Sequence, residues 1–98
     1  MANTVLVVDD EEKIRTTLQG VLSDEGFRVL ATDGSERVLD LVATERPQLV
    51  ILDIWMPQVD GIELLERIKT QAPALPVIII SGHGTIETAV RRIQDLFS

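Results

Sequence analysis

Short apolar runs alternate with amphipathic segments along the chain. The apolar runs cover residues 4–8, 48–52 and 77–80, and a weaker run covers residues 27–31. Runs of four or five apolar residues without a polar alternate predict strands that are buried on both faces, as in a parallel sheet. The pattern therefore predicts four short strands of one sheet.

The segments that follow these runs have apolar residues three and four positions apart, which predicts helices with one buried face. The expected buried positions are Ile14, Leu18, Val21 and Leu22 in the first helix, Val38, Leu39 and Val42 in the second, Ile62, Leu65 and Ile68 in the third, and Ile86, Ala89, Val90 and Ile93 in the fourth. Gly26 and Pro47 mark the ends of the first two helices.

A strand followed by a helix, four times over, predicts a parallel sheet with right-handed crossovers and helices on both faces. The chain of 98 residues has room for one such domain, which we expect to span residues 1–98. Ligands of open sheets of this kind bind beyond the carboxyl ends of the strands. Polar residues at those ends are therefore the candidates for chemistry.

Four polar side chains follow the predicted strands at this edge. Asp9 and Asp10 follow the first strand, Asp53 follows the third, and Ser81 follows the fourth. An aspartate helix cap with acids in the first turn would explain the run "DDEE" by itself, because both complement the amino end of a helix. That interpretation does not explain a second strand that also ends in aspartate.

Three carboxylates at one edge repel each other, and the pattern places no lysine or arginine there to neutralise them. Oxygen ligands without histidine or cysteine favour a hard cation such as Mg²⁺, which commonly shares a site with phosphate. The sequence thus indicates a phosphoryl-transfer site in which one carboxylate is the nucleophile.

Composition narrows the classes of partner. Sixteen acidic and nine basic residues give a net charge of −7, which disfavours direct binding to nucleic acid or to an anionic membrane. No apolar stretch approaches the roughly 20 residues needed to span a bilayer, and cysteine is absent. We expect a cytoplasmic protein without thiol chemistry.

The motifs together resemble the receiver domain of two-component response regulators. They are "TVLVVDDEEKIR", "DGSERVLDLV", "LVILDIWMPQVDGIELLERIK" and "LPVIIISGHGTIETAV", and they cover almost the whole chain. The last one is most similar to receivers of nitrogen-regulation-type, sigma-54-associated regulators. The resemblance implies a flavodoxin-like, doubly wound sheet with strand order 2-1-3-4.

The resemblance also implies a role for each site residue. Asp53 would accept a phosphoryl group from a sensor histidine kinase, and Ser81 would be the switch hydroxyl that binds the phosphoryl oxygens. Asp10 would ligate Mg²⁺ directly and Asp9 through water, with Asp53 and the backbone carbonyl of Trp55 completing the protein ligands. The domain would be a signalling module rather than an enzyme.

Family members of this type also have a fifth βα unit with a lysine at the end of its strand. Because the sequence stops at Ser98 without it, we expect a fragment or a short form that lacks the fifth unit. An alternative is a receiver-like interaction module that is not phosphorylated, and a hydrolase of the haloacid dehalogenase type ranks last. The exposed fourth strand and the following helix, residues 85–97, further predict a homodimer.

Overall fold

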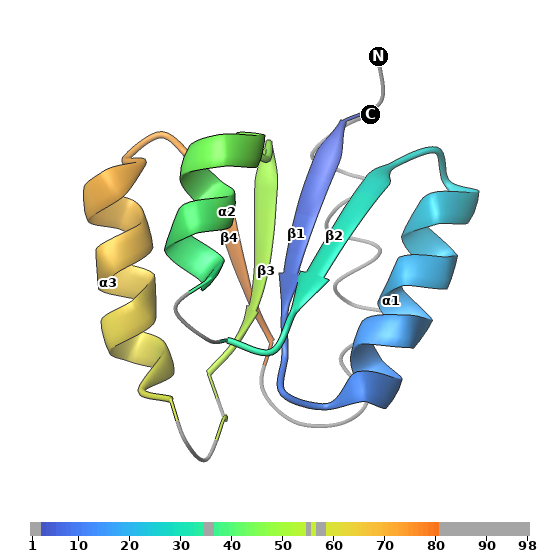
Figure 1. Cartoon of the computed structure of the whole chain (residues 1–98), viewed down its shortest axis with the longest axis horizontal. Coiled ribbons are helices and arrows are strands. Elements are labelled where there is room, and N and C mark those ends of the chain that lie inside the picture. The colour runs from blue at the N-terminus through green and yellow to red at the C-terminus, as the bar shows by residue number, and fades with distance from the viewer. Residues whose placement is uncertain (1–2, 35–36, 55, 57–58, 81–98) are drawn as a thin grey trace.

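The computed structural model describes residues 3–34, 37–54, 56 and 59–80. Within these residues a parallel sheet of four strands has the order β2-β1-β3-β4 (Figure 1). The elements are β1 (Thr4–Val8), α1 (Glu12–Asp24), β2 (Arg28–Thr32), α2 (Arg37–Glu45), β3 (Leu49–Asp53), α3 (Gly61–Gln71) and β4 (Val77–Ile80). The predicted doubly wound fold and strand order are confirmed.

The strand bounds follow the apolar runs closely. Strands β1 and β4 have the predicted bounds, whereas β2 and β3 begin and end one residue later than predicted. The shift makes Asp53 the last residue of β3, paired with Ile80 of β4. Asp53 therefore belongs to the sheet itself, and its position is set by the strand ladder.

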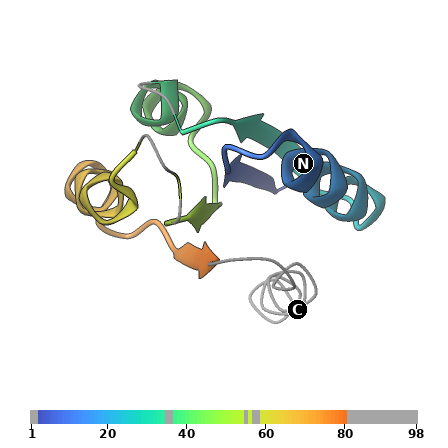
Figure 2. The same cartoon turned by 90° about the horizontal axis from the view of Figure 1, so that it is seen from below.

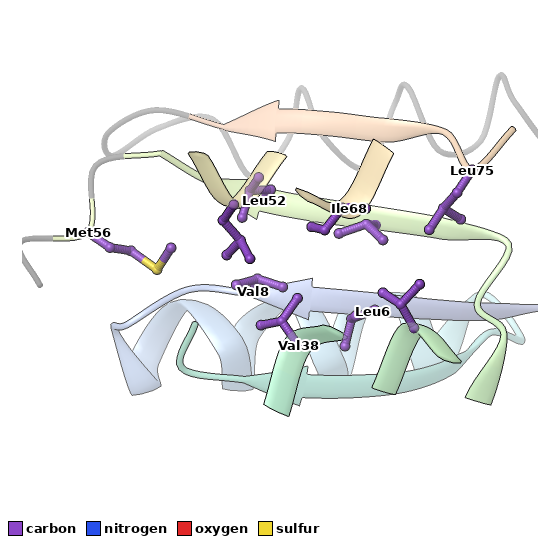
Figure 3. Close-up of a cluster of buried hydrophobic side chains, with 10 residues drawn as sticks. Leu6, Val8, Val38, Leu52, Met56, Ile68 and Leu75 are labelled. Atoms are coloured by element: carbon purple, nitrogen blue, oxygen red, sulfur yellow. The ribbon is translucent and has the colours of Figure 1, made fainter. Parts of the chain in front are cut away.

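Helices cover both faces of the sheet (Figure 2). Helix α1 covers one face, where Leu18 and Leu22 pack among alternate residues of β1, β3 and β4. Helices α2 and α3 cover the other face, and Figure 3 shows this second cluster extending from Leu75 near the start of β4 to Met56 beyond the end of β3. Because side chains alternate along a strand, each central strand supplies both clusters.

The buried face of α3 differs from the predicted one. Leu64 and Ile68 are buried together with Gly61, whereas Ile62 is 51% exposed. The apolar residues of this helix allowed two different sets of positions to form the buried face, one that includes Ile62 and one that includes Leu64. The stripe that begins with Gly61 faces inward because the backbone of this residue lies against Ile54, so Ile62 points outward.

Two predictions reach beyond this part of the chain. The predicted fourth helix, which is one half of the predicted homodimer surface, lies outside the described residues, whereas the other half is β4. Among the residues that the structure does describe, no helix is long and apolar enough to cross a membrane.

Candidate functional site

The structure brings three aspartates together at the carboxyl edge of the sheet. Carboxylate oxygens of Asp9, Asp10 and Asp53 all lie within 4.8 Å of one another. The strand register explains why Asp9 and Asp53 are neighbours. Val8 of β1 pairs with Leu52 of β3, and Asp9 and Asp53 are the residues that follow this pair. Side chains alternate along a strand, so Asp9 and Asp53 lie on the face of the sheet that α1 covers, just beyond the core residues of that face.

Burial and mutual repulsion set the charge state of Asp9. Asp9 is only 3% exposed and Asp53 only 8%, whereas Asp10 is exposed. Burial raises the pKa of the Asp9 carboxyl from the ordinary 3.8 to about 6. The backbone N–H of Glu11, which donates to Asp9 Oδ1 over 2.8 Å, lowers this pKa, and the charges of Asp53 and Asp10 raise it. Burial and the neighbouring carboxylates thus both favour the protonated form of Asp9 in the metal-free protein.

Helix α1 does not use these aspartates as caps. Its N-cap is Glu11, which makes no side-chain capping hydrogen bond, and Glu12 supplies the acid of the first turn. The interpretation of "DDEE" as an aspartate-capped helix is therefore wrong. Asp9 instead accepts from Glu11 outside the helix, and Asp10 turns its carboxylate toward the other two acids.

Arg15 lies beside the aspartate cluster, and the sequence did not predict it there. Arg15 Nη1 donates to the backbone carbonyl of Asp9 over 2.7 Å. The prediction that no lysine or arginine would be positioned at this edge was therefore incomplete. The missing signal is hard to find in a sequence, because the partner is a main-chain oxygen six residues away and leaves no pattern of side chains.

The loop that leaves Asp53 is closely packed. An added Cβ on Gly34, which has φ of +89°, would lie 2.7 Å from Sδ of Met56. Met56 is buried at the end of the second core cluster (Figure 3). Because Gly34 has no side chain, Met56, which lies three residues after Asp53, can pack against the loop that follows β2.

The same loop ends in a tightly fitted helix start. A Cβ on Gly61 would lie 2.5 Å from Cα of Ile54, so this position requires glycine for close approach rather than for a positive φ. Asp60 caps α3, and its Oδ1 accepts from the backbone N–H groups of Ile62 and Glu63 at 3.1 Å each. Asp60 and Gly61 together therefore fix the start of α3 beside Ile54.

The donor set fits a hard divalent cation. All three side chains of this cluster are carboxylates and two of them are buried, and burial followed by repulsion from the neighbouring acids raises the pKa of Asp9. Such ligands suit Mg²⁺ or Ca²⁺ rather than a metal that prefers nitrogen or sulfur. Two further predicted site residues, Trp55 and Ser81, lie outside the described residues.

Comparisons with known proteins agree on one family. The family model described as "Response regulator receiver domain" matches residues 5–95. The nitrogen assimilation regulatory protein NtrX of Azorhizobium caulinodans is 45% identical over 96 residues, which are 96% of this chain and 21% of the relative. The chain thus spans about a fifth of the length of this curated relative.

Two solved structures place the fold in the same family. The receiver domain of NtrX from Brucella abortus is 48% identical, has a TM-score of 0.75, and the match covers 92% of this chain and 77% of that one. A response regulator from Burkholderia pseudomallei, solved with a phosphorylated aspartic acid, calcium ion and citrate, is 25% identical with a TM-score of 0.76. That match covers 95% of this chain and 55% of the other.

Proposed function

This chain belongs to the response regulator receiver domain family, and we propose that it accepts a phosphoryl group on Asp53 from a sensor histidine kinase, with Mg²⁺ at the three aspartates. The observation that carries the proposal is the convergence of Asp9, Asp10 and Asp53 within 4.8 Å at the carboxyl edge of the sheet. Receivers are signalling domains, and the similarity to NtrX supports a receiver of the nitrogen-regulation type.

Asp53 is the best candidate for the acceptor among the three carboxylates. It ends a central strand, and the ladder to Ile80 fixes its backbone. Its carboxylate would form a bond to phosphorus while the bond from phosphorus to the kinase histidine breaks and the imidazole nitrogen keeps the electron pair. The Burkholderia structure supports this assignment, since that protein has the same fold and was solved with a phosphorylated aspartic acid.

Asp9 and Asp10 would hold the cation beside the acceptor. Their carboxylates approach Asp53 from the neighbouring strand end, and one of them is buried while the other is exposed. Mg²⁺ bound there would supply positive charge to the oxygens of the incoming phosphoryl group. Following the family resemblance, the Trp55 carbonyl would add a ligand and the Ser81 hydroxyl would bind the phosphoryl group after transfer.

Phosphorylation with a small acyl phosphate tests the proposal directly. Incubation with acetyl phosphate and Mg²⁺ should add one phosphoryl group to the wild-type chain, and Asp53→Asn should remain unmodified. Chelation of Mg²⁺ should suppress the reaction in the wild type. Mapping of the modification to a residue other than Asp53, or its persistence in Asp53→Asn, contradicts the assignment of the acceptor.

The test also separates the receiver that is phosphorylated from the interaction module that is not. A wild-type chain that binds Mg²⁺, folds cooperatively and never takes a phosphoryl group would support the interaction module. In that case beryllofluoride, which mimics a bound phosphoryl group, should also leave the amide spectrum unchanged.

A further inference from the structure

Arg15 makes one hydrogen bond within the first turn of α1 and a second one to Asp9, the residue after β1. Its backbone N–H donates to the carbonyl of Glu11 over 3.1 Å, which closes the first turn of the helix. Its side chain turns back across this turn, and Nη1 donates to the carbonyl of Asp9 over 2.7 Å. The guanidinium of this half-buried residue therefore lies beside Asp9.

The Asp9 residue is held at three points. Its N–H donates to the carbonyl of Thr32 over 3.0 Å, its carbonyl accepts from Arg15, and its Oδ1 accepts from the N–H of Glu11. The first bond continues the ladder between β1 and β2, and the other two lie beyond it. Past the ladder, the N–H of Glu11 holds the side chain of Asp9, and Arg15 holds its main-chain carbonyl.

We propose that Arg15 is a positioning residue for the cation site, which holds the Asp9 peptide so that the carboxylate of Asp9 faces those of Asp10 and Asp53. The inference rests on the proposed function, because it concerns how well that site binds a cation. A charge-assisted hydrogen bond is shorter and stronger than a neutral one, and the 2.7 Å distance is typical of this class. Groups that orient metal ligands in this way commonly change metal affinity by about tenfold or more.

The sign of the effect separates positioning from charge. Arg15 is positive and lies close to the proposed cation site, so through charge alone its removal should strengthen Mg²⁺ binding. Loss of a positioning contact should weaken binding instead. If Arg15 acts only by packing, a substitution that keeps its volume should leave Mg²⁺ binding unchanged.

Mg²⁺ affinity of Arg15 variants is the first measurement. Arg15→Met keeps an unbranched stem but removes the donors and the charge, and Arg15→Gln is a second uncharged variant. We expect both to raise the dissociation constant of Mg²⁺ about tenfold by calorimetry. Arg15→Lys, which can still donate to the Asp9 carbonyl, should stay within about threefold of wild type. Arg67→Met on the exposed side of α3 is the matched control and should leave the affinity unchanged.

Hydrogen exchange in the metal-free protein is the second measurement, and it needs no cation. In Arg15→Met the Glu11 amide should exchange about tenfold faster, because its acceptor on Asp9 is less well oriented. The amide of Val7, which lies in the fully buried part of β1, should keep its protection and so reports an intact fold. Arg67→Met should change neither amide.

The two measurements distinguish failure of the inference from failure of the proposed function. If wild type binds no Mg²⁺, the proposed function fails, and exchange at Glu11 alone decides whether Arg15 orients Asp9. If wild type binds Mg²⁺ and Arg15→Met binds it equally well or more tightly, Arg15 is not a positioning residue. Unchanged exchange at Glu11 in a folded Arg15→Met overturns the inference whatever the affinity.

Discussion

Two loops bring the carboxylates of this receiver together, and they are held in different ways. Hydrogen bonds hold the β1–α1 loop, which carries Asp9 and Asp10, through Arg15, Glu11 and Thr32. Close packing and a helix cap hold the β3–α3 loop, which follows Asp53. The first loop should therefore respond mainly to changes of charge, and the second mainly to changes of volume. Each of the following predictions tests one side of this comparison.

Gly61→Ala should have the largest effect, because it adds a methyl group against backbone. The new Cβ would lie 2.5 Å from Cα of Ile54, and neither atom belongs to a flexible side chain. Overpacking of this kind should lower the free energy of unfolding by about 3 kcal/mol, measured by urea denaturation. The shift should also disturb the residue next to Asp53, so phosphorylation should slow.

The control for this substitution is another helical glycine. Gly20 lies in α1 with no atom within 4 Å of an added Cβ. Gly20→Ala should raise the free energy of unfolding by about 0.5 to 1 kcal/mol, since alanine restricts the unfolded chain and favours helix. Equal effects of the two alanines would show that the β3–α3 loop is not held by close packing.

Gly34→Ala should be the second largest effect, at about 2 kcal/mol of lost unfolding free energy. It combines a positive φ of +89° with a contact of 2.7 Å to Sδ of Met56. Gly26 is the matched control, because it has φ of +93° and no neighbour within 4 Å of an added Cβ. The difference between Gly34→Ala and Gly26→Ala therefore isolates the contact with Met56. No difference would mean that the flexible end of Met56 moves away without cost.

The β1–α1 loop should show its dependence on charge in the pH profile of the metal-free protein. The pKa of Asp9 is about 6 in the folded chain and should return to the ordinary 3.8 on unfolding. The folded state then binds the proton more tightly, so stability should rise as the pH falls through 6 and level off near 4. Between pH 7.5 and pH 5 the gain from this group should be about 1.4 kcal/mol.

Other carboxylates titrate in the same range, so the test compares wild type with Asp9→Asn in the presence of a chelator. The variant has no proton to gain at this position, and its free energy of unfolding should rise less between pH 7.5 and pH 5. Parallel profiles for the two proteins would show that Asp9 carries no raised pKa. A profile for wild type that falls relative to the variant would mean that Asp9 is stabilised as a carboxylate.

The sequence predicted the fold well because the strands are buried on both faces. Apolar runs of four or five residues have the length of a buried strand rather than of a helix, and β1 and β4 have the predicted bounds. The meeting of Asp9 with Asp53 follows from the same pattern, since parallel strands place their carboxyl ends at one edge. The order of strands and aspartates in the sequence was therefore enough to predict the cluster of three carboxylates.

Two features could not be predicted, and both depend on contacts with the backbone. The buried stripe of α3 is selected by the approach of Gly61 to Ile54, whereas the side chains alone allowed Ile62 to face inward. The role of Arg15 depends on the carbonyl of Asp9, and every residue has a carbonyl. Sequence patterns describe side chains, so contacts with the main chain appear only when the chain is folded.

The helix caps offer the smallest and most direct comparison of the two loops. Asp60 accepts from two backbone N–H groups at the start of α3, whereas Glu11 at the start of α1 makes no side-chain capping hydrogen bond. Asp60→Ala should lower the free energy of unfolding by about 1 kcal/mol, and Asp60→Asn should restore most of this loss because asparagine caps almost as well. Thermal or urea denaturation measures both changes.

Glu11→Ala is the matched substitution in the other loop. It removes no cap, and it removes one of the charges that raise the pKa of Asp9, so repulsion within the acidic cluster should fall. We expect its free energy of unfolding to stay within about 0.5 kcal/mol of wild type, with a slightly smaller pH dependence. A loss as large as that of Asp60→Ala would mean that the β1–α1 loop also depends on a side chain at its helix start. The division between a loop held by hydrogen bonds to Asp9 and a loop held by packing and a cap would then be wrong.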